Sequence, residues 1–144
     1  MAKPSRIAAL AATLALTLGV AGARAQNAPL YPLADCSHLT TQMELNQCAG
    51  ANYQAADAAL NRVYRQQMAE DTDAALQQRL TAAERAWIAY RDKECAYQIG
   101  PQQDGGSIWP MEMSNCLEEL TAARIRELTK LRGCTAGVSV CNPH

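Results

Sequence analysis

The residues best suited to chemistry in this 144-residue chain are its cysteines and a few acids, because histidines are scarce. The six cysteines are Cys36, Cys48, Cys95, Cys116, Cys134 and Cys141. An even number of cysteines in a small domain is typical of disulfides formed in an oxidising compartment. We therefore expect all six to form structural bonds, which leaves no cysteine as a nucleophile.

Catalytic chemistry has weak support elsewhere in the chain. His38 and His144 are the only histidines, and neither lies in a zinc-binding spacing or beside a nucleophile-elbow motif. A carboxylate pair for acid–base catalysis would have to come from Glu84, Asp92, Glu94 and Glu112. Acids on helix faces usually serve solubility, so we expect no enzyme, no metal site and no other cofactor. An enzyme acting on peptidoglycan through Glu84 or Asp92 is a minor alternative.

The first 25 residues have the pattern of a secretory signal peptide. A basic start precedes an apolar run over residues 7–20, which is too short to span a bilayer, and a small-x-small cleavage pattern ends at Ala25. A lipobox ending at Cys36 is the alternative, but Asp35 directly before the cysteine argues against lipid attachment. We expect cleavage after Ala25 and a periplasmic or secreted protein without a membrane span.

Removal of the signal peptide changes the charge of the chain. Lys3, Arg6 and Arg24 leave with it, so 13 basic residues become 10 while all 14 acids stay, and the formal net charge moves from −1 to −4. A mildly acidic domain is a poor binder of nucleic acid, whereas a basic protein would be attracted to it.

Three long helices are predicted after an extended arm. The predicted elements are the arm at 26–40 and helices at 41–68, 73–98 and 110–131. Thr41 and Glu44 form a capping-box pattern, Asp73 lies in an acidic helix start, and Pro110 suits a first helical turn. The fold class is therefore all-α: a small antiparallel helical bundle in which the first two helices form a hairpin and the third packs across them.

The second predicted helix contains the most informative stretch, Leu80 to Cys95. At 3.6 residues per turn, one stripe holds Leu80, Ala83, Trp87 and Tyr90, and the neighbouring stripe holds Glu84, Ile88, Arg91 and Cys95. We expect the first stripe to face the core, with Trp87 as a core residue; a partner's hot spot is the alternative. Arg124 falls on an apolar stripe of the third helix, which predicts a buried stem with a paired head.

The connection between the second and third helices is glycine-rich. Residues 100–107 lack the lysine and the spacing of a phosphate-binding loop, so we expect a flexible connection with Ser107 near the next helix start. The element positions favour a sequential disulfide pairing: Cys36–Cys48, Cys95–Cys116 across this loop, and Cys134–Cys141 in the tail. Each bond would close a short loop and stabilise a domain with an alanine-rich, thin core.

Several short motifs occur in a recognisable order. They are MELNQC at 43–48, Tyr53 with Ala56-Asp57, LNRVY at 60–64, ERAWI at 84–88 with Tyr90-Arg91-Asp92 and Cys95, Gly105-Gly106-Ser107, Cys116-Leu117 and TAAR at 121–124. This ordered set resembles the lysozyme inhibitor LprI, N-terminal domain family, over residues 36–131, and the tail at 132–144 lies outside it. The family-motif residues are Asn46, Tyr53, Asp57, Trp87, Arg91, Asp92 and Arg124. The resemblance implies a helical, disulfide-bonded fold.

The resemblance also implies a non-catalytic binding protein that inhibits lysozyme-type muramidases. The candidate partner-binding loop consists of Gly105, Gly106, Ser107 and Trp109, which would occlude the cleft of the partner enzyme; the alternative is that this loop only connects helices. A competing function is an envelope adaptor or structural module that binds a protein other than lysozyme.

Overall fold

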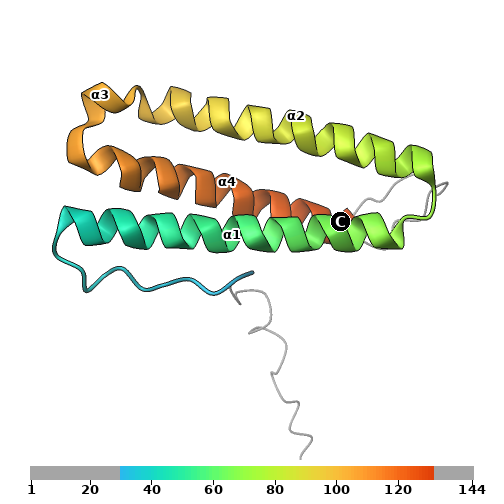
Figure 1. Cartoon of the computed structure of the whole chain (residues 1–144), viewed down its shortest axis with the longest axis horizontal. Helices are drawn as coiled ribbons and strands as arrows, with labels where there is room; N and C mark the ends of the chain where they lie inside the picture. The colour runs from blue at the N-terminus through green and yellow to red at the C-terminus, as the bar shows by residue number, and fades with distance from the viewer. Residues whose placement is uncertain (1–29, 132–144) are drawn as a thin grey trace, which may run out of the picture.

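The computed structural model describes residues 30–131, which form a bundle of three long helices (Figure 1). The helices are α1 (Gln42–Glu70), α2 (Ala74–Ile99) and α4 (Trp109–Leu131), with the short helix α3 (Gln102–Gly105) and the 3₁₀ turn η1 (Gly106–Ile108) between α2 and α4. The all-α prediction is confirmed, and the three long helices begin and end close to their predicted limits. The signal-peptide prediction and the Cys134–Cys141 pairing lie outside the described residues.

Local signals in the sequence account for the helix ends. Thr41 and Glu44 form the expected capping box: the Glu44 amide donates to Thr41 Oγ1, and the Thr41 amide donates to the Glu44 carboxylate. Asp73 caps α2 by accepting from the Ala75 amide at 2.8 Å. The helix α2 continues through Thr81, whose hydroxyl donates to the Gln77 carbonyl one turn earlier. At the end of α2, Gly100 has a φ of 76°, which favours glycine.

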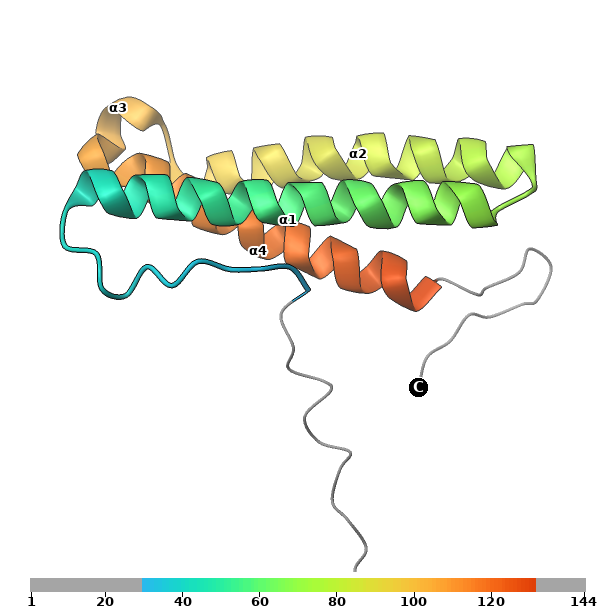
Figure 2. The ribbon, with the colours of Figure 1, turned by 60° about the horizontal axis from the view of Figure 1, so that its bottom comes forward.

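The closest helix pair is α1 with α4, which run in the same direction, while α2 returns antiparallel to both (Figures 1 and 2). The core cluster joins the two parallel helices through Ala56, Ala59, Leu60, Val63, Ala122, Ile125 and Leu128. Small alanines on α1 let the α4 backbone approach closely. The first two helices run antiparallel as predicted, but α2 packs mainly against α4, so the third helix lies between α1 and α2 in contact rather than across a hairpin of the two.

The face that α2 turns inward also differs from the prediction. Its buried residues are Glu84, Arg91 and Cys95, all from the stripe predicted to lie beside the core. Leu80 and Trp87 are partly buried, whereas Ala83 and Tyr90 of the predicted core stripe are exposed. The disulfide of Cys95 explains this orientation, because it turns that side of α2 toward Cys116 on α4.

The N-terminal arm is already anchored to the bundle at Tyr31, before it reaches the disulfide at Cys36. Tyr31 is buried in the core cluster, and its hydroxyl donates to Glu118 of α4. Burial, together with this carboxylate, raises the pKa of Tyr31 above its ordinary value. Asn52 of α1 then pairs with both backbone groups of Ala34, at 2.7 and 3.1 Å. The arm therefore runs along α1 as an ordered strap (Figure 2). No helix within residues 30–131 is long and apolar enough to cross a membrane.

Candidate functional site

A cluster of polar and aromatic side chains fills the space where α2 meets the other two long helices. We call it the polar seam; its members are Tyr53, Asp57, Glu84, Trp87, Arg91, Asp92, Thr121 and Arg124. The apolar core cluster joins mainly α1 to α4, so the seam is the main means by which α2 is held.

Arg91 lies at the centre of the polar seam and is 6% exposed. Its guanidinium carbon lies 5.5 Å from the ring centre of Tyr53 and 5.3 Å from that of Trp87, so two aromatic faces stabilise its charge. Its Nε and Nη2 donate to Asp92 at 2.9 and 2.8 Å, and Asp57 lies 3.7 Å from Nη1. Arg91 therefore connects α1 and α2 and, through a longer bond to Thr121, also α4.

Arg124 holds the other side of Trp87. It pairs with the buried Glu84 through Nε at 2.9 Å and through Nη2, and with the exposed Glu127 at 2.9 Å. Burial opposes the charge of this guanidinium, but the hydrogen bonds to Glu84 and Glu127 outweigh burial and raise the pKa of Arg124. The predicted buried stem with a paired head is confirmed. Glu84, interpreted from the sequence as a solvated acid, is instead 7% exposed and ion-paired.

The structure brings six of the seven family-motif residues into the polar seam: Tyr53, Asp57, Trp87, Arg91, Asp92 and Arg124. Asn46 lies apart, where its side chain donates to the Ser107 carbonyl at 2.9 Å. Thr121 and Glu84 were recognised only as parts of the motifs TAAR and ERAWI, and the partner of Glu84 is Arg124 of another helix. The spacing of Glu84, Trp87 and Arg91 places all three on one helix face. Two of the acids considered for catalysis, Glu84 and Asp92, are committed to arginines.

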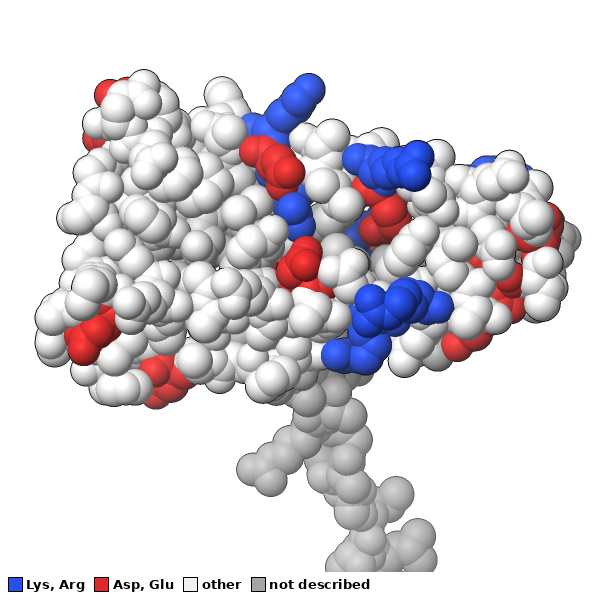
Figure 3. Space-filling model, viewed as in Figure 1, with Lys and Arg blue, Asp and Glu red and all other residues white. Residues whose placement is uncertain are grey.

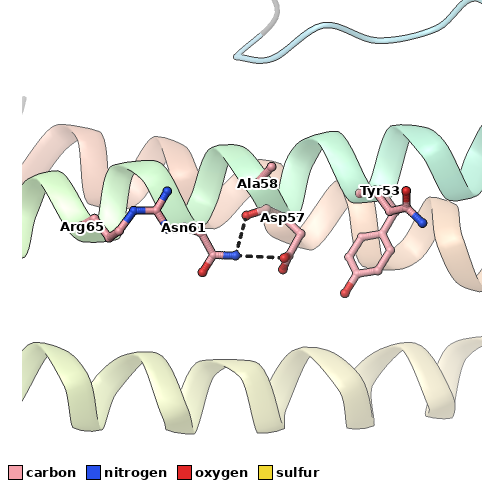
Figure 4. A pocket seen from close by; sticks show the side chains of 6 residues that line it. Tyr53, Asp57, Ala58, Asn61 and Arg65 are labelled. Atoms are coloured by element: carbon pink, nitrogen blue, oxygen red, sulfur yellow. Dashed lines mark hydrogen bonds between the residues drawn. The ribbon is translucent and has the colours of Figure 1, made fainter.

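The polar seam reaches the surface beside α1. A hollow of about 500 Å³ is lined by Tyr53, Gln54, Asp57, Ala58, Asn61 and Arg65 (Figure 4). Asn61 Nδ2 donates to the backbone carbonyl and the carboxylate of Asp57, at 3.0 and 2.9 Å. Asp57 is thus held toward α2 and its arginine while one side stays open to solvent. Within residues 30–131, no group of three or more His, Cys, Asp or Glu side chains could hold a metal ion.

The glycine-rich connection folds into α3 and η1 at one end of the bundle, which we call the loop end (Figure 2). Trp109 Nε1 donates to the Gly100 carbonyl at 2.9 Å, and Asn46 of α1 holds the Ser107 carbonyl. Gly106 has a φ of 56°, which favours glycine. The predicted flexible connection is therefore a hydrogen-bonded one, and the half-buried Trp109 supports it from inside.

Gly105→Ala is expected to lower the free energy of unfolding by about 1–3 kcal/mol, because overpacking strains its neighbours. A methyl at this position would lie 2.7 Å from Cδ1 of Trp109, and the loop would have to move. Gly50→Ala is the matched control: it meets no atom within 4 Å inside α1 and should stabilise by up to about 1 kcal/mol. Urea unfolding of both variants measures the difference, and equal midpoints would contradict the role given to Gly105.

Both disulfides of the described chain lie at the loop end. Cys36–Cys48 joins the arm to α1, and Cys95–Cys116 joins the end of α2 to the start of α4. These are two of the three predicted pairings, with Cα–Cα distances of 6.0 and 5.7 Å. The Cys95–Cys116 bond, together with Asn46 and Trp109, holds α3 and η1 in a fixed position.

The basic residues of the described chain are confined to residues 62–93 and 124–131. Residues 30–61 and 94–123, which include the loop end, contain no lysine or arginine. Their acids are Asp35, Glu44, Asp57, Glu94, Asp104, Glu112, Glu118 and Glu119. Hydrogen bonds from Ser37 hold the pKa of Asp35 below its ordinary value, and those from Thr41 do the same for Glu44. The part of the surface nearest α3 accordingly shows acids and uncharged atoms but no basic group (Figure 3).

Large apolar side chains are exposed in the same region. Tyr97 in the last turns of α2 is 84% exposed, Met43 in the first turn of α1 is 67% exposed, and Ile108 of η1 is 40% exposed. The loop end therefore combines exposed acids with exposed aromatic and aliphatic side chains.

The fold and the site define a small helical protein that is held by disulfides and whose polar interior is committed to internal pairing. The chain matches the model of the family Lysozyme inhibitor LprI over residues 34–128, and it belongs to that family, as the resemblance implied. It is also 45% identical over 112 residues to an uncharacterized protein of Rhizobium meliloti (strain 1021), covering 69% of this chain and 80% of the relative. No solved structure matches the chain.

Proposed function

We propose that this protein is a non-catalytic inhibitor of lysozyme-type muramidases and that the loop end is its binding surface. Membership of the LprI family supports the class of function. The observation that carries the proposal is the loop end itself, where exposed apolar side chains, acids and two disulfides occur without a basic residue in residues 30–61 and 94–123.

The mechanism we propose is occlusion of the muramidase cleft by α3 and η1. Their exposed residues, including Gly106 and Ser107, form the tip, while Gly105 and Trp109 keep its shape from behind. Tyr97 and Met43 flank the tip and supply apolar contact area. A preformed tip loses little conformational freedom on binding, which favours affinity. Acids around it would steer a basic enzyme toward the correct orientation.

Export is part of the proposal. We propose that residues 1–25 are removed and that the mature protein acts in the periplasm or outside the cell. The two disulfides support this, because such bonds persist in oxidising compartments. N-terminal sequencing of the protein purified from its native host should begin at Gln26.

The direct test is a cell-wall clearing assay with c-type, g-type and i-type lysozymes in parallel. Oxidised mature protein is titrated into each enzyme, and dose-dependent loss of clearing by at least one enzyme is expected. Absence of both inhibition and binding at micromolar concentration with all three would overturn the proposal and favour an envelope adaptor.

Removal of two acidic charges from the loop end is expected to slow association with a basic lysozyme by about three- to tenfold at low salt. The variant combines Asp104→Asn with Glu112→Gln, both exposed residues of the loop end. The control combines Gln78→Lys with Ala82→Lys, exposed on α2 toward its other end, and changes the net charge equally. Stopped-flow or surface-based kinetics measure both. Equal slowing in the two variants would show that net charge, rather than the loop end, steers binding.

A further inference from the structure

The hollow beside α1 is lined almost entirely by polar side chains (Figure 4). Four of its residues, Tyr53, Asp57, Asn61 and Arg65, are spaced by four and therefore share one face of the helix. Its volume of about 500 Å³ falls within the size range of small-ligand sites. The hollow lies along the middle of α1, away from α3 and η1, so its role does not depend on the function proposed above (Figure 1).

Two acceptors in the centre of the hollow are held in fixed positions. Asn61 Nδ2 donates to the backbone carbonyl and to the carboxylate of Asp57, so Oδ1 of the same amide is turned away from them and is left as an acceptor. The Asp57 side chain is 45% exposed, and its charged neighbour Arg91 lies 3.7 Å away, so the carboxylate has lone pairs left for further hydrogen bonds. Figure 4 shows Asp57 and Asn61 pointing from α1 toward α2.

Donors lie on either side of these two acceptors. Tyr53 is half-buried with its ring 5.5 Å from the guanidinium carbon of Arg91, yet its hydroxyl has no hydrogen-bond partner within residues 30–131. Arg65 is exposed at the opposite end of the hollow and has no acidic partner in that part of the chain. The hollow therefore presents a hydroxyl, a carboxylate, an amide oxygen and a guanidinium in sequence, all with free hydrogen-bonding capacity.

The charges of the lining balance, because it contains one acid, Asp57, and one base, Arg65. An anion would be repelled by the carboxylate, and a cation would be repelled by Arg65 and by Arg91, so the arrangement favours an uncharged ligand. Of the described lining residues only Ala58 is aliphatic, which disfavours a peptide that binds through apolar side chains. The best match is a ligand whose neutral groups both donate and accept hydrogen bonds.

We propose that this hollow binds an uncharged oligosaccharide, with Asp57 and Asn61 accepting from its hydroxyl groups and Tyr53 and Arg65 donating to its oxygens. Every ring of a saccharide carries several groups that are donor and acceptor at once, which is the pattern that the hollow requires. The affinity is expected to be weak, because the hollow is open to solvent and each hydrogen bond replaces one to water. Binding here leaves the loop end accessible, so a glycan and a protein partner could be held together.

A chemical-shift titration of the isotope-labelled mature chain tests the site. The probes are triacetylchitotriose, maltotriose and inorganic phosphate, each at millimolar concentration. At least one trisaccharide is expected to shift the amide signals of residues 53–65, and phosphate is expected to shift none of them. Absence of shifts with both trisaccharides would overturn the proposal. Shifts with phosphate alone would also overturn it and would make the hollow an anion site at Arg65.

Two tyrosines of α1 provide a matched pair of variants. Tyr53→Phe removes a hydroxyl without a partner in the described chain and keeps the ring beside Arg91, so it should weaken trisaccharide binding about three- to tenfold and leave urea unfolding unchanged. Tyr64→Phe removes a hydroxyl that pairs with Thr81 at 3.0 Å, so it should lower the unfolding midpoint and leave binding unchanged. Equal trisaccharide affinities in the two variants would overturn the role of the Tyr53 hydroxyl.

A larger side chain placed in the hollow tests its position. Ala58 and Ala86 are both exposed residues within long helices, but only Ala58 lines the hollow. Ala58→Tyr should abolish the trisaccharide shifts, whereas Ala86→Tyr should retain them, and the cost of tyrosine in a helix is common to both. Unchanged binding in Ala58→Tyr, with the same unfolding midpoint as Ala86→Tyr, would place the saccharide elsewhere on the protein.

Discussion

Glu84→Ala is expected to lower the free energy of unfolding by about 3–5 kcal/mol, the largest effect of any single side chain in the polar seam. The substitution removes the carboxylate that holds the buried side of Arg124. It leaves a guanidinium that is only 15% exposed, beside Trp87 and without its inner partner. Removing one member of a buried ion pair is far more harmful than replacing both, because the remaining charge stays desolvated.

The second partner of Arg124 provides the control. Glu127 binds the same guanidinium at 2.9 Å, but its side chain is 58% exposed, so Glu127→Ala should cost less than about 1 kcal/mol. A double variant, Glu84→Leu with Arg124→Met, should recover most of the loss, since apolar side chains of similar volume replace a buried ion pair well. Urea unfolding with a common slope measures all three variants. Equal losses in Glu84→Ala and Glu127→Ala would contradict the burial argument.

The helices themselves were predictable because their signals are local. Thr41 with Glu44, Asp73, and Pro110 each act within one helical turn, and each lies at or next to the observed start of a helix. The disulfides at Cys36–Cys48 and Cys95–Cys116 were predictable for a related reason, since each joins residues whose elements must come close along the chain.

The partner of each helix was not predictable from hydrophobic periodicity. On α2 the apolar stripe through Ala83 and Tyr90 is exposed, while Glu84 and Arg91 face inward. A prediction from hydrophobicity places Glu84 and Arg91 on the surface, because both are charged. Their burial depends on charged partners from the other helices: Arg91 pairs with Asp57 of α1, and Glu84 pairs with Arg124 of α4. The disulfide at Cys95 and the polar contacts of Glu84 and Arg91 hold the same face of α2 toward its neighbours.

The motif residues of the site were found, but their roles were not. Trp87, Arg91 and Arg124 come from separate motifs, and only the fold shows that Trp87 lies between the two guanidiniums, at 5.3 and 5.9 Å. The roles of Asn46 and Trp109 were not predicted either. Both side chains donate to backbone carbonyls of the connection between α2 and α4, and no local sequence pattern specified the shape of that connection. Sequence spacing identifies which residues matter, whereas contact across helices decides what they do.

Removal of the Cys95–Cys116 bond by a double alanine substitution is expected to cost about 3 kcal/mol of stability. If the loop end is the binding surface as proposed, it should also remove most of the inhibition. The bond spans 21 residues of sequence and is the only described covalent link between α2 and α4. Its loss would free the last turns of α2, where Tyr97 lies, and the base of α3. The binding surface would then lose its preformed shape, which lowers affinity even in molecules that remain folded.

Removal of the Cys36–Cys48 bond is expected to lower the stability of the protein but to leave the proposed inhibition intact. It spans 12 residues, and on the chain-entropy account its stabilisation is slightly smaller than that of the longer link, at about 2–3 kcal/mol. It holds the arm, which is also anchored by Tyr31 and Asn52, so Cys36→Ala with Cys48→Ala should retain inhibition in folded protein.

Graded reduction should break the Cys36–Cys48 bond before the Cys95–Cys116 bond, because Cys36 is half-buried whereas Cys95 is 0% exposed. Inhibition of cell-wall clearing should therefore survive loss of the first bond and be lost with the second; loss of inhibition with the first bond would place the binding surface on the arm instead of the loop end.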